Sequence, residues 1–269
     1  MEFDPTLLNE PSLRALLAHL NRWSTKGKKL SYGFLAPLTT SQQIAATKLN
    51  SIYSKVLWGI CNDADNRSIR QDEKELLTGY LKESVWGSEV IEVGTGSGRL
   101  TGYASTVCKQ LVAIDRDPTV VARLKSRSFI KKRKNIKIVC ADLIQLKQED
   151  QYSALLLMEN LIGMYLKETC RRQILQKALE VIRPGGLAFI SFRVVEQSSP
   201  LSFQAMPYDA KLPSGERIHL FGVVVNWTVA AFMKELDKVS REVHLIDLHE
   251  GGKRPAGGTM FTAILKKQI

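Results

Sequence analysis

A glycine-rich turn between a strand and a helix constrains this chain more than any other feature. The β-branched run from Val90 to Val93 predicts a buried strand, and glycines follow at positions 94, 96 and 98. Glycine at every second position lets the backbone turn tightly and lets a ligand approach without meeting a Cβ atom. The spacing differs from a dinucleotide fingerprint, because Arg99 stands where its third glycine would be. No Gly-Lys-Ser/Thr follows, which excludes a P-loop.

Strands and helices alternate after residue 88. We expect strands over 90–93, 111–115, 136–140, 153–158 and 187–192. Helices are expected to begin at Asp117-Pro118 and to cover 169–182. This alternation predicts an α/β fold, with a mostly parallel sheet covered by helices on both faces. A hairpin is expected over 196–226, around Pro213-Ser214-Gly215, and strands over 243–248 and 260–265 close the chain.

The first part of the chain has a helical pattern instead. Apolar residues recur at helical spacing over 13–20, over 41–56 and over 72–81. We therefore expect two parts: an N-terminal helical region over 1–85 that acts as a cap or lid, and an α/β domain over 86–269.

Composition places the chain among globular proteins. Of 269 residues, 44% are apolar and 24% are charged. No apolar run approaches the 20 or so residues of a membrane span, and residues 1–4 show no feature of a secretory signal. The four cysteines lack the spacing of a metal or redox motif, so we expect free thiols, no metal site and a cytoplasmic protein without membrane contact.

The net charge of +11 is concentrated in one segment. Eight basic residues, uninterrupted by any acid, fall within 123–137: Arg123, Lys125, Arg127, Lys131, Lys132, Arg133, Lys134 and Lys137. One hypothesis is a patch that binds RNA or another polyanion. The other is a solvated helix end and loop that keeps the protein in solution. We refer to this segment as the basic block.

Two aspartates end the second and third strands of the alternating region. Asp115 comes 21 residues after Gly94, where a carboxylate can accept both hydroxyls of a ribose. Asp142 follows the third strand, where its carboxylate can accept the amine of an adenine while Leu143 offers its backbone N–H. Such acids at successive strand ends predict a nucleoside-binding site.

With these motifs, residues 50–265 resemble the class I S-adenosylmethionine-dependent methyltransferases. The resemblance rests on Glu92 to Gly98, Leu111 to Asp115, Ala141-Asp142, Met158 to Asn160 and Arg183 to Gly186. It implies a Rossmann-like, seven-stranded sheet whose last strand is antiparallel, and S-adenosylmethionine as cofactor. The cofactor-binding residues that it implies are Tyr53, Glu92, Gly94, Thr95, Gly96, Gly98, Asp115, Arg116, Asp142 and Leu143.

The end of the fourth strand bears on the type of methyl acceptor. Glu159-Asn160-Leu161-Ile162 stands where adenine methyltransferases usually carry Asp/Asn-Pro-Pro-aromatic, and no Pro-Cys nucleophile is present. The segment is more similar to small-molecule N- and O-methyltransferases, so a small-molecule acceptor is the leading hypothesis. An RNA-modifying enzyme that uses the basic block is the alternative. A non-catalytic binding protein of the same fold is a third.

Several residues are candidates for the acceptor side. We expect Glu159 and His219 to act in catalysis, and Asn160, Tyr165 and Trp227 to contact the acceptor. Glu159 and Glu168 have the spacing of the two glutamates in protein arginine methyltransferases, which gives a lesser alternative, a guanidine acceptor. The oligomeric state stays open.

Overall fold

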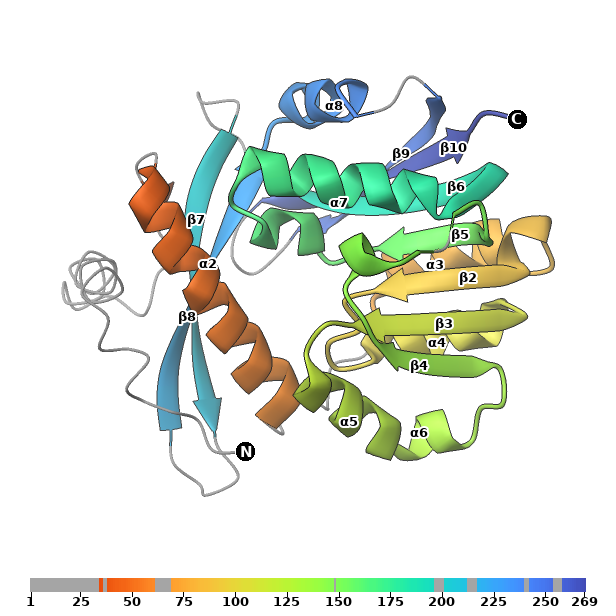
Figure 1. Cartoon of the computed structure of the whole chain (residues 1–269), viewed down its shortest axis with the longest axis horizontal. Coiled ribbons are helices and arrows are strands. Elements are labelled where there is room, and N and C mark those ends of the chain that lie inside the picture. The colour runs from red at the N-terminus through yellow and green to blue at the C-terminus, as the bar shows by residue number, and fades with distance from the viewer. Residues whose placement is uncertain are drawn as a thin grey trace.

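One mixed β-sheet forms the centre of the protein (Figure 1). The computed structural model describes residues 34–35, 38–60, 69–147, 149–195, 201–211, 217–239, 242–253 and 258–269. The ten strands of this sheet are β1 (Phe34–Leu35), β2 (Glu89–Val93), β3 (Gln110–Asp115), β4 (Ile136–Cys140), β5 (Tyr152–Leu157), β6 (Ile182–Val194), β7 (Leu201–Lys211), β8 (Arg217–Trp227), β9 (Val243–Lys253) and β10 (Thr259–Lys267).

Seven of these strands form a continuous core in the order β4-β3-β2-β5-β6-β10-β9. Strands β2 to β6 pair in parallel, whereas β10 is antiparallel to both β6 and β9. The predicted seven-stranded sheet with an antiparallel last strand is therefore confirmed. The β7–β8 hairpin joins the same sheet through the pair Val194–Trp227, and β1 adds to β7. The sequence predicted the hairpin but not that it lengthens the sheet.

The helices have local sequence causes. Thr39 caps α2 in a capping box with Gln42, and Asp117 caps α5 with Pro118 in the first turn. The longer helices are α2 (Thr40–Ser54), α3 (Gln71–Leu81), α4 (Arg99–Val107), α5 (Pro118–Ser126), α7 (Glu168–Glu180) and α8 (Val229–Asp237). Short helical segments are η2 (Lys55–Ile60), η4 (Val85–Gly87), α6 (Ser128–Lys131), η5 (Leu143–Gln145) and η6 (Leu161–Met164). The helix expected over 13–20 and the turn at 213–215 lie outside the described residues.

Both faces of the sheet are buried, because helices cover each of them. In Figure 1, α7 lies in front of the sheet and α3 and α4 lie behind it. Alternate residues of β5 therefore enter different cores: Leu155 and Leu157 pack on the α7 side, and Ala154 and Leu156 on the side of α3 and α4. Helix α3, which our prediction placed in the N-terminal helical region, packs into this second core. The division of the chain at residue 85 stays a prediction.

Helix α2 packs apolar side chains into the core and is also held by one buried amide. Asn50 donates from Nδ2 to the carbonyls of Val223 in β8 (2.7 Å) and Met164 in η6 (3.0 Å). Its Oδ1 accepts from the Val223 N–H at 2.7 Å. A single amide thus satisfies both backbone groups of Val223 and joins α2 to two other elements. No helix in the described part of the chain has the length and apolar character that crossing a bilayer requires.

Replacing this amide tests how α2 is held. We expect Asn50→Ala to lower the free energy of unfolding by about 2 kcal/mol, because buried backbone groups lose their partners. Amide protection in α2 should also fall in hydrogen exchange. Ser51→Ala, an exposed change on the same helix, is the control and should shift stability by less than about 0.5 kcal/mol. Equal stability of the two variants would mean that other contacts hold α2.

Candidate active site

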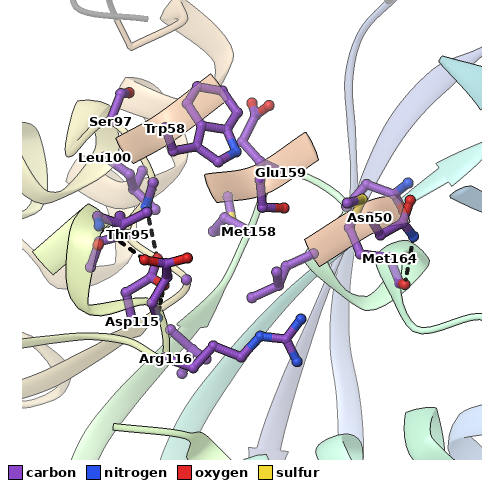
Figure 2. A pocket seen from close by; sticks show the side chains of 18 of the residues that line it. Asn50, Trp58, Thr95, Ser97, Leu100, Asp115, Arg116, Met158, Glu159 and Met164 are labelled. Carbon is purple, nitrogen blue, oxygen red and sulfur yellow. Dashed lines mark hydrogen bonds between the residues drawn. The ribbon is translucent and has the colours of Figure 1, made fainter. Parts of the chain in front are cut away.

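A cavity of about 690 Å³ opens at the carboxyl ends of the central strands (Figure 2). It lies where β2 neighbours β3 on one side and β5 on the other, which is the switch point where α/β sheets bind ligands. Its first half is lined from the ends of β2 and β3 and from the loop after β4. Its second half is lined from α2, from the segment after β5, and from β6, β7, β8 and β10.

The glycine turn forms one wall of the first half. Gly94, Gly96 and Gly98 all have positive φ, at 73°, 51° and 78°. A Cβ on Gly94 would lie 2.5 Å from Leu161 Cδ2, and one on Gly96 would lie 3.4 Å from the Trp58 ring. Gly94 and Gly96 line the cavity, but Gly98 does not. Gly98 is the N-cap of α4, and a Cβ there would lie 2.2 Å from Leu124 Cδ1; its predicted contact with the cofactor stays a prediction.

The two strand-end aspartates face the same cavity. Asp115 accepts from the Gly96 N–H (3.2 Å) and the Asp117 N–H (3.0 Å), which fixes its carboxylate beside the glycine turn. Burial raises the pKa of Asp115, although those two N–H groups oppose the shift. Asp142 caps η5 by accepting from the Ile144 N–H at 3.1 Å. The remaining predicted residues of this half, Thr95, Arg116 and Leu143, also line the cavity.

Glu92 is a buried carboxylate of the site that is only partly hydrogen-bonded. It is 2% exposed, and its Oε2 has no hydrogen-bond partner among the described residues. The hydroxyl of Thr95, in the same wall, is also buried without one in that part of the chain. Burial raises the pKa of Glu92 to about 8, despite opposing effects of Thr101 and Arg99. A ligand that brings a hydrogen-bond donor or a positive charge would stabilise this carboxylate.

The raised pKa of Glu92 predicts a pH-dependent stability. The unfolded chain releases this proton near pH 4.5, whereas the folded protein keeps it up to about pH 8. The folded state binds more protons across this window, so the free energy of unfolding should fall as the pH rises through it. We expect Glu92→Gln to flatten this fall and to be more stable than wild type at pH 8 in urea unfolding.

The control for this measurement is Glu89→Gln, an exposed change at the start of the same strand. It should leave the pH dependence as in wild type. An unchanged pH profile in Glu92→Gln would show that Glu92 does not titrate in this window.

Glu159 and Asn160 bend the chain sharply at the end of β5. Both have left-handed backbones, with φ of 58° and 56°, which is uncommon for residues other than glycine. Asn160 is buried and accepts at Oδ1 from the Arg193 N–H at 3.2 Å. Two neighbouring non-glycine residues in this conformation are typical of functional sites, where packing enforces strain.

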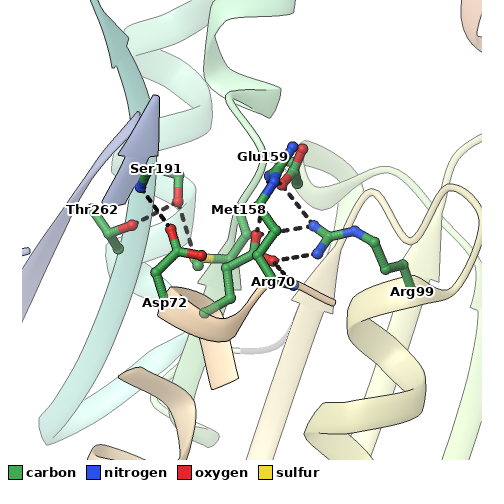
Figure 3. A network of polar contacts seen from close by, with 9 residues as sticks. Arg70, Asp72, Arg99, Met158, Glu159, Ser191 and Thr262 are labelled. Carbon is green, nitrogen blue, oxygen red and sulfur yellow. Dashed lines mark hydrogen bonds and ion pairs between the residues drawn. The ribbon is translucent and has the colours of Figure 1, made fainter. Parts of the chain in front are cut away.

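The Glu159 carboxylate belongs to an ion-pair network (Figure 3). It pairs with Arg70, and with Arg99 Nη2 at 2.7 Å. Arg99 also forms a bidentate ion pair with the buried Glu73, in which the distance from Nη2 to Oε1 is 3.0 Å. Glu73 in turn accepts from the Arg70 N–H at 3.0 Å, which begins α3. The network joins α3, the glycine turn and the segment after β5.

Removing one charge from this network should be costly. We expect Glu73→Gln to lower the free energy of unfolding by about 3 kcal/mol, because it leaves the Arg99 guanidinium buried with a weaker partner. Glu75→Gln, an exposed change in the same helix, should cost less than about 0.5 kcal/mol. Chemical denaturation compares the two, and equal values would show that the buried pair contributes little.

The other predicted residues fall in different places. Tyr53, Asn160 and Tyr165 line the cavity. Trp227 does not: it is fully buried in the core against Phe232, with Nε1 donating to Glu235 at 2.8 Å. The prediction that Trp227 contacts the acceptor is therefore wrong.

The hypothesis that Glu159 and Glu168 act as a pair is not supported, because Glu168 does not lie at the cavity. Glu168 begins α7, is half-exposed, pairs with Arg172 and Lys238, and does not line the cavity. The structure does not bring it to Glu159. His219 lies in β8 opposite Asp209, but its side chain is outside the described part, so its predicted role stays a prediction.

Several cavity residues escaped the sequence analysis. They are Asn50, Trp58, Arg70, Met158, Met164, Arg193, Met206 and Met260. Trp58 lies on a π-helical segment, a geometry common at functional sites, but nothing in its sequence neighbours indicates this. Arg193 is the one with a local signal, because a charged residue stands in the apolar strand β6. Among described residues, no group of three or more His, Cys, Asp or Glu side chains is arranged to hold a metal.

Comparisons with known proteins agree with this geometry. Residues 90–186 match the family model described as a methyltransferase domain. The chain is 30% identical over 146 residues to phosphoethanolamine N-methyltransferase 1 of Arabidopsis thaliana, covering 54% of this chain and 29% of that protein. It is 26% identical over 153 residues to its Triticum aestivum counterpart, covering 56% and 30%. The chain thus spans less than a third of these relatives.

Solved structures share the fold. The 1,6-didemethyltoxoflavin-N1-methyltransferase of Burkholderia thailandensis, solved with S-adenosylhomocysteine, superposes with a TM-score of 0.61 at 16% identity, over 88% of this chain and 95% of that one. A methyltransferase of Clostridium acetobutylicum gives 0.59 at 12%, over 82% and 98%. Residues 90–186 therefore match the methyltransferase-domain family, and the chain shares the fold of these solved methyltransferases.

This fold alone does not define a reaction. The [4+2]-cyclase SpnF superposes with a TM-score of 0.56 at 13% identity, over 83% of this chain and 96% of that one. The assignment of function must therefore come from the cavity.

Proposed function

We propose that this protein binds S-adenosylmethionine in the first half of the cavity and transfers its methyl group to a nitrogen or oxygen of a small molecule in the second half. One observation carries the proposal. A turn without side chains at Gly94 and Gly96, a fixed carboxylate at Asp115 and a buried, incompletely satisfied carboxylate at Glu92 all face one cavity.

The residues of the first half fit the parts of this cofactor. Glu92 and Thr95 offer buried acceptors without partners among the described residues, which suits the amino end of the methionyl group. Asp115 would accept the ribose hydroxyls, and Asp142 with the N–H of Leu143 would meet the adenine. Cβ atoms would fill the space beside Gly94 and Gly96, so close backbone approach there requires glycine.

When bound, S-adenosylmethionine supplies a sulfonium methyl group, whose C–S bond breaks as the acceptor lone pair forms the new N–C or O–C bond, leaving S-adenosylhomocysteine and a proton from the acceptor. The protein must align the lone pair and exclude water. Helix α2 and Trp58 cover the cavity, and Asn50 holds α2 in place. Asn160 and Tyr165 line the same cavity, and we assign to them the orientation of the acceptor.

A small acceptor suits this site better than RNA. No residue of the basic block lines the cavity. The block lies on α5, α6 and the edge strand β4, with most of its side chains exposed. The relatives' names favour nitrogen as the atom to examine first, because both curated relatives and the toxoflavin enzyme are named as N-methyltransferases. The free thiols Cys108, Cys140 and Cys170 support a location in the reducing cytoplasm.

Titration calorimetry with S-adenosylhomocysteine tests the proposal. We expect wild-type protein to bind it, and Asp115→Ala to bind about 100-fold more weakly, because two hydrogen bonds to a charged acceptor are lost. Asp237→Ala, an exposed change on α8, is the control and should bind as wild type does. Labelled S-adenosylmethionine with a panel of small amines, phenols and acids then detects transfer.

No binding by wild-type protein would contradict the proposal. It would favour the non-catalytic binding protein of the same fold. Binding without transfer to any small acceptor, but with transfer to RNA, would favour the RNA-modifying alternative.

A further inference from the structure

Methionine side chains gather in the second half of the cavity. We propose that this half binds an uncharged aromatic acceptor that presents a nitrogen with a free lone pair. The inference rests on the function proposed above and adds the class of acceptor. It follows from three features of the described residues: the methionine wall, the engagement of the charged groups by the protein itself, and the ion pairs of the one carboxylate in this half.

The methionine wall is assembled from distant parts of the chain. Five methionines lie in the described residues, and four of them line this one cavity. Met158 follows β5, Met164 ends η6, Met206 lies in β7 and Met260 lies in β10. The methionine thioether is polarisable, adapts to irregular shapes and makes favourable contacts with aromatic rings. The wall therefore favours an aromatic body over a polar or a saturated one.

Three of these methionines meet at the carboxyl end of β6. Met260 lies opposite Arg193 in the register of β10 and β6, and Met206 Sδ is 3.9 Å from Arg193 Nη1. Met158 Sδ accepts from the Ser191 hydroxyl at 3.2 Å, two residues earlier on β6. A ring that enters this part of the cavity would therefore meet thioethers from three different elements.

The charged groups of this half are engaged within the protein. Arg70 and Arg99 both pair with Glu159. Arg193 contacts Met206 and has further interactions within the protein. A charged acceptor would have to displace one of these contacts to find its own partner, whereas an uncharged acceptor leaves them in place. The arrangement therefore favours an acceptor that binds without charge.

The same ion pairs restrict proton transfer. Glu159 is the one carboxylate among the described residues of this half, and no histidine, lysine or cysteine of the described part lines the cavity. To take a proton from an acceptor, Glu159 would have to weaken its pairs with two guanidiniums. An alkylamine is protonated at neutral pH and must lose that proton before it reacts, whereas an arylamine or an aromatic ring nitrogen need not.

The transfer then balances without a base. The nitrogen lone pair forms the new N–C bond while the C–S bond breaks, and its electron pair stays on sulfur. An arylamine afterwards loses a proton to water from the methylated, positively charged nitrogen. A ring nitrogen without hydrogen keeps the positive charge.

Binding to the protein saturated with S-adenosylhomocysteine at pH 7 tests the inference. The first pair of probes, 4-methylphenol and 4-methylcyclohexanol, compares an aromatic with a saturated ring at zero charge. The second pair, 4-methylaniline and 4-methylbenzylamine, compares an uncharged with a protonated aromatic amine. We expect the first compound of each pair to bind about tenfold more tightly than the second.

The variant combines Met206→Leu with Met260→Leu, which keeps the apolar volume and removes two thioethers. We expect its preference for 4-methylphenol over 4-methylcyclohexanol to fall to about threefold or less, with unchanged affinity for S-adenosylhomocysteine. The matched control is Met233→Leu, the same change on α8 and outside the cavity, which should behave as wild type.

Each contrary result has a distinct meaning. Wild-type protein that binds S-adenosylhomocysteine but binds the two ring compounds equally, or binds neither, would overturn the aromatic acceptor and leave the proposed function standing. Tighter binding of 4-methylbenzylamine than of 4-methylaniline would overturn the uncharged acceptor. A full preference for 4-methylphenol in the folded double variant would overturn the role of the methionines. No binding of S-adenosylhomocysteine by wild type would overturn the proposed function itself.

Discussion

The site depends on a backbone turn that only glycine accommodates. Strand β2 ends where its backbone must leave the sheet and begin α4 within a few residues, and it does so through three positive φ angles. The Gly94 N–H donates to Ile114 at 2.8 Å and the Gly96 N–H to Asp115 at 3.2 Å, so the turn is tied to β3. Leu161 and Leu124 pack into the space that Cβ atoms would occupy at Gly94 and Gly98. The turn therefore sets both the cavity wall and the packing behind it.

Charge in this cavity is distributed unevenly between its two halves. The first half concentrates carboxylates, and the most buried of them, Glu92, holds its proton to about pH 8 in the ligand-free protein. The second half is lined by Arg70, which pairs with Glu159, and by Arg193. A cationic ligand group therefore fits the side of Glu92.

The ion-pair network links these halves mechanically. Arg99 follows the glycine turn directly and contacts both Glu73 of α3 and Glu159 at the end of β5 (Figure 3). A shift of the glycine turn would therefore also displace Glu159 and Asn160, whose backbones are in the left-handed conformation. The ion-pair network thus explains why arginine, and not the third glycine of a dinucleotide fingerprint, stands at position 99.

The sequence predicted those parts of the site that are encoded by neighbouring residues. The glycine turn, Asp115 and Asp142 stand at strand ends, and parallel strands bring their carboxyl ends to one edge. Arg193, Met206 and Met260 come from strands whose pairing depends on long-range register, so their meeting could not be read from spacing. Trp227 shows the reverse error. It ends β8, next to the cavity in sequence, but its side chain points into the core beside α8.

A crystal structure with S-adenosylhomocysteine tests the central claim most directly. The account predicts the ligand in this cavity, with its amino end toward Glu92, its ribose on Asp115 and its adenine beside Asp142. It also predicts that the second half of the cavity stays free for an acceptor. A ligand bound elsewhere, or one whose ribose does not meet Asp115, would contradict the account.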